Sequence, residues 1–274
     1  MSLKGYIQKN KKRLRKRRKL IVFLCILSIL GLTTSTYAWF TVNTFAGVQD
    51  FELQISTGDD LRVSMDNHGS DIEQYTHVIT NDMLDSYLRK NYNKSLADVI
   101  LDPVTTNNGR SFTYQNGSKA DPNGEESYFE FECYFIATRD MHVHLTTEEG
   151  VDEDGKKIEG TRVSSESPAP KSDVVRANRI SFDPADATGN AKTYEPNKGS
   201  QVTSLTTFDL PNGSMTYNDS NNLFSLEKLT PKKVTVRLWL EGEDPECVNR
   251  IQGSNLHVRL AFVGIRNGQT TPMG

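Results

Sequence analysis

The chain has 274 residues, of which 36% are hydrophobic and 24% are charged. Ten of its 32 basic residues and none of its 35 acidic ones lie in residues 1–40, which leaves 22 basic against 35 acidic residues, a net charge of −13, in residues 41–274. Phosphate contacts need clustered cations, so this acidic balance argues against a nucleic-acid partner. The remaining length suits one all-β domain, or at most two small ones.

The first 40 residues have the order of an export signal. A basic arm at residues 1–19 precedes an apolar run at 20–32, and small residues follow. This order is typical of a signal peptide, in which Thr36 and Ala38 would stand third and first before a cut that leaves Trp39 as the new N-terminus. The basic arm directly before the apolar run also agrees with the positive-inside rule.

Two fates remain open for residues 20–40. The apolar run of 13 residues is shorter than the roughly 20 that a spanning helix needs, which favours a cleaved signal. Extended to residue 40, the segment is long enough to cross the membrane once and to anchor the chain. Either fate places residues 41–274 outside the cell or on its surface, in contact with the membrane only through the N-terminal segment.

Alternation of apolar and polar residues is the main structural signal in the rest of the chain. A period of two gives a strand one buried and one solvated face. The segments with this pattern are, in chain order, 51–55, 61–65, 128–138, 141–145, 174–182, 223–226, 233–241 and 256–262.

One helix is predicted after Thr80 or Asn81, and a short helical turn at 95–100. Two polar stretches, residues 148–172 and 183–201, are expected to be exposed loops. The fold class predicted is all-β: an antiparallel, jelly-roll-like β-sandwich with one or two short helices, preceded by the N-terminal signal or anchor helix. The expected organisation is therefore a cytoplasmic arm at 1–19, a signal or span at 20–40, and an extracellular domain at 41–274.

Three short segments resemble a known family. They are Tyr-Ala-Trp-Phe-Thr at 37–41, Leu-Asp-Pro-Val-Thr-Thr-Asn-Asn-Gly at 101–109, and Val-Arg-Leu-Trp-Leu-Glu-Gly-Glu-Asp-Pro-Glu-Cys at 236–247. Together with the alternating strand that ends the chain, they resemble the alternate-signal-mediated exported proteins of Gram-positive bacteria, relatives of the TasA/camelysin family. The basic arm here is longer than in TasA-like proteins.

The resemblance implies an export route and a role. A dedicated, SipW-like signal peptidase would cut the chain, and the mature part would be a jelly-roll-like sandwich. Members of the TasA branch form fibres of the biofilm matrix. Assembly of this chain into fibres is thus an expectation by analogy of fold and export.

No catalytic, cofactor-binding or metal-binding residue is predicted. Camelysin-type relatives have been described as metallopeptidases, but the sequence contains no His-Glu-x-x-His pair and no Gly-x-Ser-x-Gly elbow. His142 and His144 share one face of a strand and need a third ligand, for which His257 is the candidate. The alternative is that both are exposed strand residues. An acidic stretch at 152–155 lacks the final glutamate of a calcium loop.

Three further features each leave two interpretations. Cys133 and Cys247 either form a disulfide outside the cell or, for Cys133, leave a buried free thiol. Trp239 points outward by alternation, and either packs beneath a loop or marks a partner surface. The acidic residues from Glu241 to Glu246 either bind a cation or accept hydrogen bonds from turn amides.

The sequence therefore favours an exported, non-enzymatic structural protein of the cell surface or biofilm matrix. Copies would assemble by β-strand addition, in which a freed segment at 39–55 pairs with the sheet of a neighbour through Phe51, Leu53 and Ile55. The alternative is a monomeric, membrane-tethered ectodomain that binds a ligand or partner through its two long loops. A metal-dependent hydrolase is the least favoured function.

Overall fold

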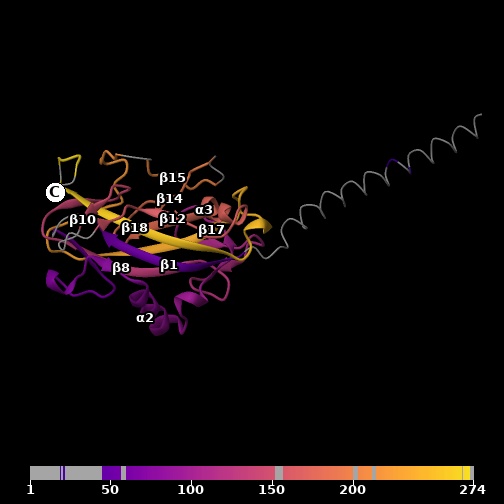
Figure 1. The fold of residues 1–274 in the computed structure, drawn as a ribbon, viewed down its shortest axis with the longest axis horizontal. Helices are drawn as coiled ribbons and strands as arrows, with labels where there is room; N and C mark the ends of the chain where they lie inside the picture. Colours follow the sequence, from indigo (N-terminus) through magenta and orange to yellow (C-terminus); the bar gives the residue numbers. More distant parts are fainter. Residues whose placement is uncertain are drawn as a thin grey trace, which may run out of the picture. The chain divides into compact units, whose positions relative to one another are not determined.

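A computed structural model describes residues 45–56, 60–151, 157–199, 203–211, 214–266 and 268–271, together with Lys19 and Ile21. The chain forms two compact units, Met1–Asn43 and Thr44–Gly274. The second unit contains two large β-sheets that enclose a shared core (Figure 1). The fold is mostly β and sandwich-like, as the alternating segments predict.

The first sheet, called sheet A, is built around the last strand of the chain. Its main order is β16 (Phe224–Leu226), β9 (Met141–Leu145), β18 (Ser254–Arg266), β1 (Ala46–Ile55) and β3 (Val78–Ile79). Two short strands complete it: β12 (Arg162–Ser164) pairs with β18, and β4 (Ile100–Leu101) pairs with β1.

The second sheet, called sheet B, is built around β17. Its order is β15 (Thr207–Phe208), β14 (Lys192–Tyr194), β13 (Asn178–Pro184), β17 (Lys232–Glu241), β8 (Phe129–Ala137) and β2 (Leu61–Ser64). A short strand, β5 (Pro103–Val104), also pairs with β17. The strands at both edges are short, which limits the length of unpaired backbone that another chain can approach.

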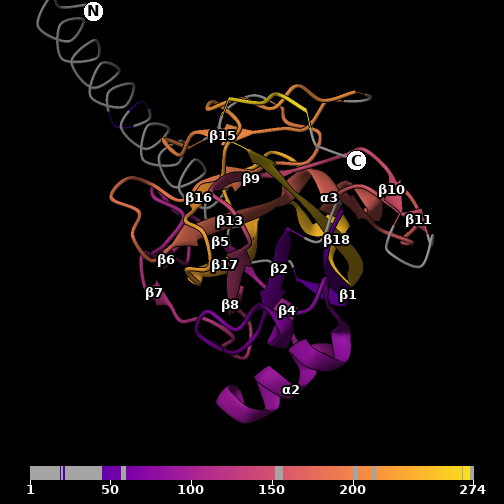
Figure 2. The same ribbon diagram turned by 90° about the vertical axis from the view of Figure 1, so that its left-hand side faces the viewer.

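Helices and small hairpins lie outside the two sheets. The helices of the described chain are α2 (Asn81–Tyr92), α3 (Val174–Ala177) and 3-10 turns at Ile72–Gln74, Leu96–Asp98, Lys171–Asp173 and Asn249–Ile251. The hairpins are β6 (Phe112–Thr113) with β7 (Lys119–Ala120), and β10 (Gly150–Val151) with β11 (Lys157–Ile158). Figure 2 shows α2 below the sheets, on the side of β4, β2 and β1.

Helix α2 forms where the sequence predicts it. Its N-cap is Thr80 in an extended conformation, and Leu84 and Leu88, one helical turn apart, are buried in the core. Asn93 ends the helix with a φ of 55°, a left-handed conformation that asparagine tolerates better than most residues. The short turn predicted at 95–100 is the 3-10 helix Leu96–Asp98, closed by a capping box between Ser95 and Asp98.

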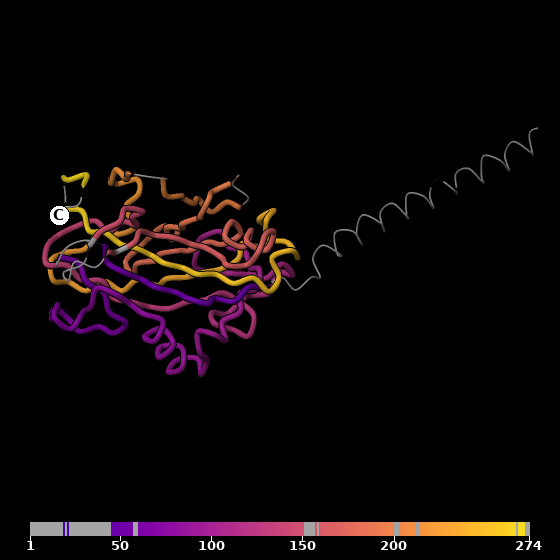
Figure 3. The backbone as a smooth tube through the Cα atoms, viewed as in Figure 1, coloured from indigo at the N-terminus to yellow at the C-terminus, as the bar shows by residue number. Residues whose placement is uncertain are grey.

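The first and last strands of the domain run side by side in parallel. Phe51 lies opposite Val258, and Ile55 lies opposite Phe262. The purely antiparallel arrangement predicted from the sequence is therefore wrong for this pair, and also for β14 with β15 and for β5 with β17. A parallel pair needs a long connection, which here is the whole of the domain between β1 and β18. Figure 3 shows the two strands, indigo and yellow, extending together.

Aromatic side chains from both sheets fill the core. Phe51 of sheet A makes edge-to-face contacts with Phe129 and Phe131 of sheet B, at ring-centroid distances of 5.6 and 5.2 Å. Phe262 of sheet A contacts Phe182 of sheet B edge to face at 5.6 Å and packs against Phe135 of the same sheet with tilted rings at 5.1 Å. These contacts explain the inward period-two pattern, because each strand contributes every second residue to one layer.

Three predicted segments differ from the structure. Residues 174–182 were expected to be one strand, but α3 occupies the first four of them and β13 starts at Asn178. The two stretches expected to be exposed loops contain β12 and β14, and Thr193 and Tyr194 are buried. Pairing with β18 and β13 holds them in the sheets although they contain few large apolar residues.

Candidate functional site

The structure brings together two of the segments that carry the family resemblance. Strand β5, from the segment at 101–109, pairs in parallel with the end of β17, so that Pro103 lies opposite Leu240 and Val104 opposite Glu241. The N–H of Gly242 continues the ladder by donating to the carbonyl of Val104 at 3.0 Å. The candidate site is built around this junction, on the outer face of sheet B.

A buried guanidinium joins four parts of the chain at this junction. Arg179, at the start of β13, is 2% exposed. Its Nη2 lies 2.5 Å from Asp244 and 2.9 Å from Glu195, and its Nη1 donates to the carbonyls of Arg176 and Asn178. The guanidinium therefore connects β13 to α3, to the turn after β14 and to the turn after β17. Removing only one partner of such a buried ion pair strongly destabilises the fold, because the other charge is left buried and unpaired.

The acidic residues after β17 accept hydrogen bonds from turn amides. Glu241 accepts from the indole N–H of Trp239 at 3.1 Å and from the backbone N–H of Glu243 at 3.3 Å, and Asp244 accepts from the N–H of Glu246 at 2.9 Å. The structure thus agrees with the interpretation in which these residues accept hydrogen bonds from turn amides. Burial raises the pKa of Glu241.

The segment at 101–109 also contributes a carboxyl group to the junction. Asp102 directly precedes β5, and its backbone N–H donates to the carbonyl of Ser127. Burial, with a smaller contribution from nearby Glu126, raises the pKa of Asp102 to about 6. The Asp102 carboxyl therefore loses its proton near pH 6, a pH at which an ordinary aspartate is already ionised.

Trp239 lies beneath a loop and is fully buried. The loop runs from residue 102 to residue 128 and is called the cover loop here. Phe112 and Tyr128 of the cover loop pack with Trp239 in a small core separate from the main one, and the Phe112 and Trp239 rings meet edge to face at 5.0 Å. The interpretation of Trp239 as a partner surface is wrong, because the cover loop already occupies that face.

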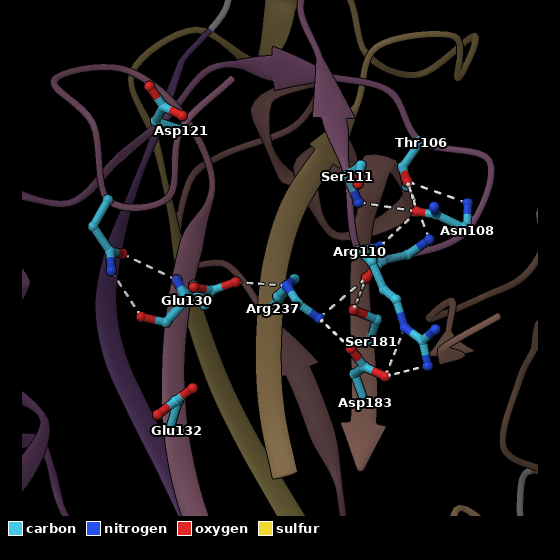
Figure 4. A network of polar contacts seen from close by, with 12 residues as sticks. Thr106, Asn108, Arg110, Ser111, Asp121, Glu130, Glu132, Ser181, Asp183 and Arg237 are labelled. Carbon is cyan, nitrogen blue, oxygen red and sulfur yellow. Dashed lines mark hydrogen bonds and ion pairs between the residues drawn. The ribbon is translucent and has the colours of Figure 1, made fainter. Parts of the chain in front are cut away.

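Ion pairs hold the cover loop across three strands (Figure 4). Arg237 of β17 lies 2.6 Å from Glu130 of β8 and 3.2 Å from Asp183 of β13. Asp183 in turn lies 2.6 Å from Arg110 of the cover loop. The charges alternate in sign from strand to strand, so each carboxylate faces a guanidinium.

The tip of the cover loop needs its Asn-Asn-Gly sequence. The Asn108 carboxamide oxygen accepts from the N–H groups of Arg110 and Ser111 at 2.8 and 2.9 Å. Gly109 has a φ of 70°, and a Cβ at this position would approach the Ala191 Cβ to 3.0 Å. Its carbonyl accepts from the Ser181 hydroxyl at 2.9 Å. Glycine is therefore required both for the turn and for the close approach to sheet B.

Together, these contacts attach the cover loop and the turns after β14 and β17 to the strands of sheet B. Arg179, Arg237 and Arg110 each face carboxylates of the same domain, and the rings of Trp239 and Phe112 are buried. The arrangement is suited to holding the two sheets and the cover loop together.

The disulfide considered as one alternative for Cys133 and Cys247 is not formed. Cys133 and Cys247 are free thiols. Cys133 lies in the main core opposite Val234, near the start of β17, whereas Cys247 follows the end of that strand. The alternative of a buried free thiol is correct for Cys133, and burial raises the pKa of both cysteines.

The three histidines considered for zinc are not brought together. His142 and His144 of β9 lie opposite Ile265 and Val263 of β18, and Val263 is six residues beyond His257, roughly 20 Å along the strand. Within the described chain no three His, Cys, Asp or Glu side chains are grouped as metal ligands.

The interpretation of both β9 histidines as exposed residues is wrong for His144. This residue is 2% exposed, and its Nδ1 lies 3.0 Å from the Asn221 carbonyl. Its ring lies edge-on to that of Tyr217, at a centroid distance of 5.3 Å. Burial lowers the pKa of His144.

The predicted assembly residues belong to the core of their own domain. Phe51 and Leu53 are fully buried, and Ile55 is 2% exposed. Within the described chain this segment is not a free strand, because β1 is paired along its length with β18. The predicted cleavage residues Thr36, Ala38 and Trp39 lie outside the described residues.

Sequence reasoning missed the buried Arg179 and its partner Glu195. Arg179 lies beside Ile180 in a segment expected to be a strand with a buried face, and a charge in such a position is a signal of a buried pair. Glu195 gave no comparable signal, because it lies in a stretch that was expected to be an exposed loop.

Searches of family models, curated proteins and solved structures found no match to this chain. Among the residues that the structure describes, none belongs to a helix long and apolar enough to cross a membrane. The apolar run at 20–32, apart from Ile21, lies outside those residues.

Proposed function

We propose that this chain is an exported, non-enzymatic building block of a bacterial cell surface or extracellular matrix, with a jelly-roll-like domain, and that its copies join by exchanging β1. Support for export comes from the basic arm, the apolar run and the small residues before Trp39. A SipW-like signal peptidase would release the domain, and an uncut N-terminal segment would anchor it in the membrane instead.

The observation that carries the assembly mechanism is the position of β1. It is the first strand of the domain, directly after the export segment, and its longest ladder is the parallel one to β18. On its other side, among the described residues, its ladders to β3 and β4 pair two residues each, and single backbone hydrogen bonds join Val48 to Val99 and Ile55 to His77. A strand at the end of a chain can leave its place without threading the rest of the domain.

Exchange preserves the interactions that β1 makes. If β1 of one copy takes the place beside β18 of another, then Phe51, Leu53 and Ile55 fill the same core positions as in the monomer. Exchange of an identical element is therefore a low-cost route to oligomers. Deleting residues 39–55, by contrast, would remove a core strand and could not separate failed assembly from failed folding.

A pair of engineered cysteines tests the exchange directly. Glu52 of β1 lies opposite Arg259 of β18, with the carboxylate 3.8 Å from the guanidinium. Adjacent strands are about 4.8 Å apart, which is within the range that a disulfide spans. The double variant Glu52→Cys with Arg259→Cys would be expressed as the full chain in an exporting host and collected under oxidising conditions.

Exchanged and unexchanged β1 strands give different disulfides. Exchange predicts disulfides between chains, seen as a ladder of covalent oligomers on a denaturing gel without reductant. A disulfide only within single chains would contradict exchange and would favour the monomeric, membrane-tethered ectodomain. The matched control is Glu52→Cys with Arg266→Cys, because Arg266 lies opposite Met141 and not beside β1. A Cys247→Ser background removes the half-buried native thiol.

A further inference from the structure

The segment that precedes β16 crosses the outer face of sheet A. It comprises residues 215–222 and is called the strap here. Met215 and Tyr217 of the strap are 6% and 1% exposed, and they form a small core with Val263 and Ile265 of β18. None of these four side chains belongs to the main core between the sheets. The strap therefore covers apolar side chains on the outer face of the sheet.

Polar contacts attach the strap to β9 and to the residues that follow β9. The hydroxyl of Tyr217 lies 2.6 Å from that of Thr146, and the N–H of Met215 donates to the Glu148 carboxylate at 3.0 Å. Directly after the strap, the N–H of Leu223 donates to a carbonyl of β9 at 2.9 Å. These are single contacts and not the rungs of a ladder, and segments held in this way are the first to open locally.

His144 of β9 lies beneath the strap. Val143 and Leu145 on either side of it face the main core, so the histidine faces the opposite way. It is 2% exposed, its Nδ1 lies 3.0 Å from the Asn221 carbonyl, and its ring lies edge-on to that of Tyr217. Since a carbonyl only accepts, Nδ1 carries the proton of the neutral ring, and a second proton has to add at Nε2.

The closed strap disfavours that second proton. Burial lowers the pKa of His144, and the nearby His142 acts in the same direction. The hydrogen bond to Asn221 and the charge of Asp219 oppose this effect without cancelling it. Opening the strap returns the ring to water, where its ordinary pKa is 6.5. Protons therefore bind the open form better, so the stability of the closed strap is complete above pH 6.5 and falls as the pH drops below it.

The other groups that face the strap differ in their response to acid. Burial raises the pKa of Tyr217 to about 12, so this side chain is uncharged at neutral and acidic pH. Strand β18 presents apolar side chains, and β16 presents Ser225. Glu148 is the rival group, because its carboxylate accepts from the N–H of Met215 and lies 3.3 Å from the hydroxyl of Tyr217.

We propose that His144 makes the strap sensitive to pH: a proton added to its ring below neutral pH releases residues 215–222 from sheet A and exposes Val263 and Ile265, while the two sheets stay packed. The strap can leave in this way because its buried side chains belong to the small outer core. The switch is a property of the folded domain. It does not depend on export or on whether β1 is exchanged.

Hydrogen exchange of the full chain tests the switch. The reporters are the amides of Tyr217, which donates to Thr270, and of Leu223. As the pH drops from about 7.5 to about 5, we expect their protection factors, corrected for intrinsic exchange, to fall severalfold, whereas the amides of β17 keep theirs. In the variant His144→Gln the side chain stays neutral and can still donate to the carbonyl of Asn221. Its strap protection should not change with pH.

The matched control is His142→Gln, the same substitution two residues away on the same strand. It keeps His144 and should retain the wild-type response. A response that persists in His144→Gln overturns the proposal and identifies Glu148 as the titrating group. Equal strap protection at all pH values in the wild type also overturns it, and so does a parallel loss of protection in β17, because the change would then be global unfolding.

Should His144→Gln fail to fold, the wild type provides a second test. The ring resonances of His144, followed by NMR, report its protonation, while hydrogen exchange of the same samples reports the strap. Loss of strap protection that follows the titration of His144 supports the proposal. A strap that remains as protected after His144 has been protonated as it was before overturns it.

Discussion

The guanidinium of Arg179 lies 2.5 Å from the carboxylate of Asp244, 65 residues away along the chain. Both side chains are buried, and the same guanidinium also pairs with Glu195. This pair explains why an acidic turn follows the β17 strand. The turn carries the second partner of a buried arginine, and it thereby fixes the end of sheet B on which the cover loop lies.

Removing the guanidinium should destabilise the domain strongly. Arg179→Met leaves Asp244 and Glu195 buried without their cation, and we expect the free energy of unfolding to fall by about 3–5 kcal/mol. Urea unfolding of the exported protein measures this change. The control is Arg139→Met, which removes an exposed partner 3.6 Å from Asp60 and should change stability by less than about 1 kcal/mol. Equal effects of the two substitutions would contradict the account.

Asp102 should make stability depend on pH near neutrality. Its pKa in the folded domain is raised to about 6, so between pH 6 and its unfolded pKa of 3.8 the folded state binds more protons. Its contribution to stability is therefore lost as pH rises through 6 and is present at lower pH. Asp102→Asn should stabilise the domain at pH 7.5 by on the order of 1 kcal/mol, allowing for solvent screening.

The pH profile distinguishes this effect from a general one. The advantage of Asp102→Asn should shrink as the pH falls below 6 and vanish near pH 4, in denaturant titrations at a series of pH values. An advantage that is constant with pH would show that the carboxyl of Asp102 is not perturbed in the folded domain. Substitution of the exposed Asp121 by asparagine is the control and should show no such profile.

Gly160 should not tolerate a side chain. A Cβ at this position would lie 2.2 Å from the carbonyl oxygen of Thr147, where the chain enters β12 beside β18. Because the clash is with backbone, Gly160→Ala should lower the midpoint of thermal unfolding, with a loss of about 1–3 kcal/mol. Gly189→Ala is the matched control, since a Cβ there meets nothing within 4 Å. A neutral Gly160→Ala would contradict the close approach.

Replacing Leu229 by glycine should stabilise the domain. Its φ of 52° places the Cβ of an L-residue against the following carbonyl oxygen, in the turn between β16 and β17. Leu229→Gly removes that contact and should stabilise the domain by about 0.5–1 kcal/mol, whereas Leu229→Ala keeps the Cβ and should not. Differential scanning calorimetry of the two variants measures the difference. Greater stability of the alanine variant would contradict the argument.

Local patterns predicted the long strands and α2, because each buries every second or every fourth residue in one core. They did not predict that β1 and β18 run in parallel, since alternation carries no information about strand direction. They also placed Trp239 on the outer face correctly but could not show what covers it. The cover loop is 110 or more residues earlier in the sequence, and its contact with Trp239 depends on the pairing of β5 with β17.

The sequence alone indicated part of the junction. The two segments at 101–109 and 236–247 were recognised separately, and the structure adds that they pair. Arg179 and Glu195 complete the charges of the junction from two other segments, and only the three-dimensional fold brings those segments close. Phe51, Leu53 and Ile55 were identified as a strand with one apolar face, but their alternation could not distinguish a core strand from a donated one.

We propose above that residues 41–274 function outside the cell after export. Fractionation of cells that express the full chain, followed by mass spectrometry of its N-terminus, tests this most directly. The account predicts an extracellular protein that begins at Trp39, or a membrane-bound chain with its first 40 residues intact and its domain outside. A soluble, intracellular chain that still begins at Met1 would contradict it.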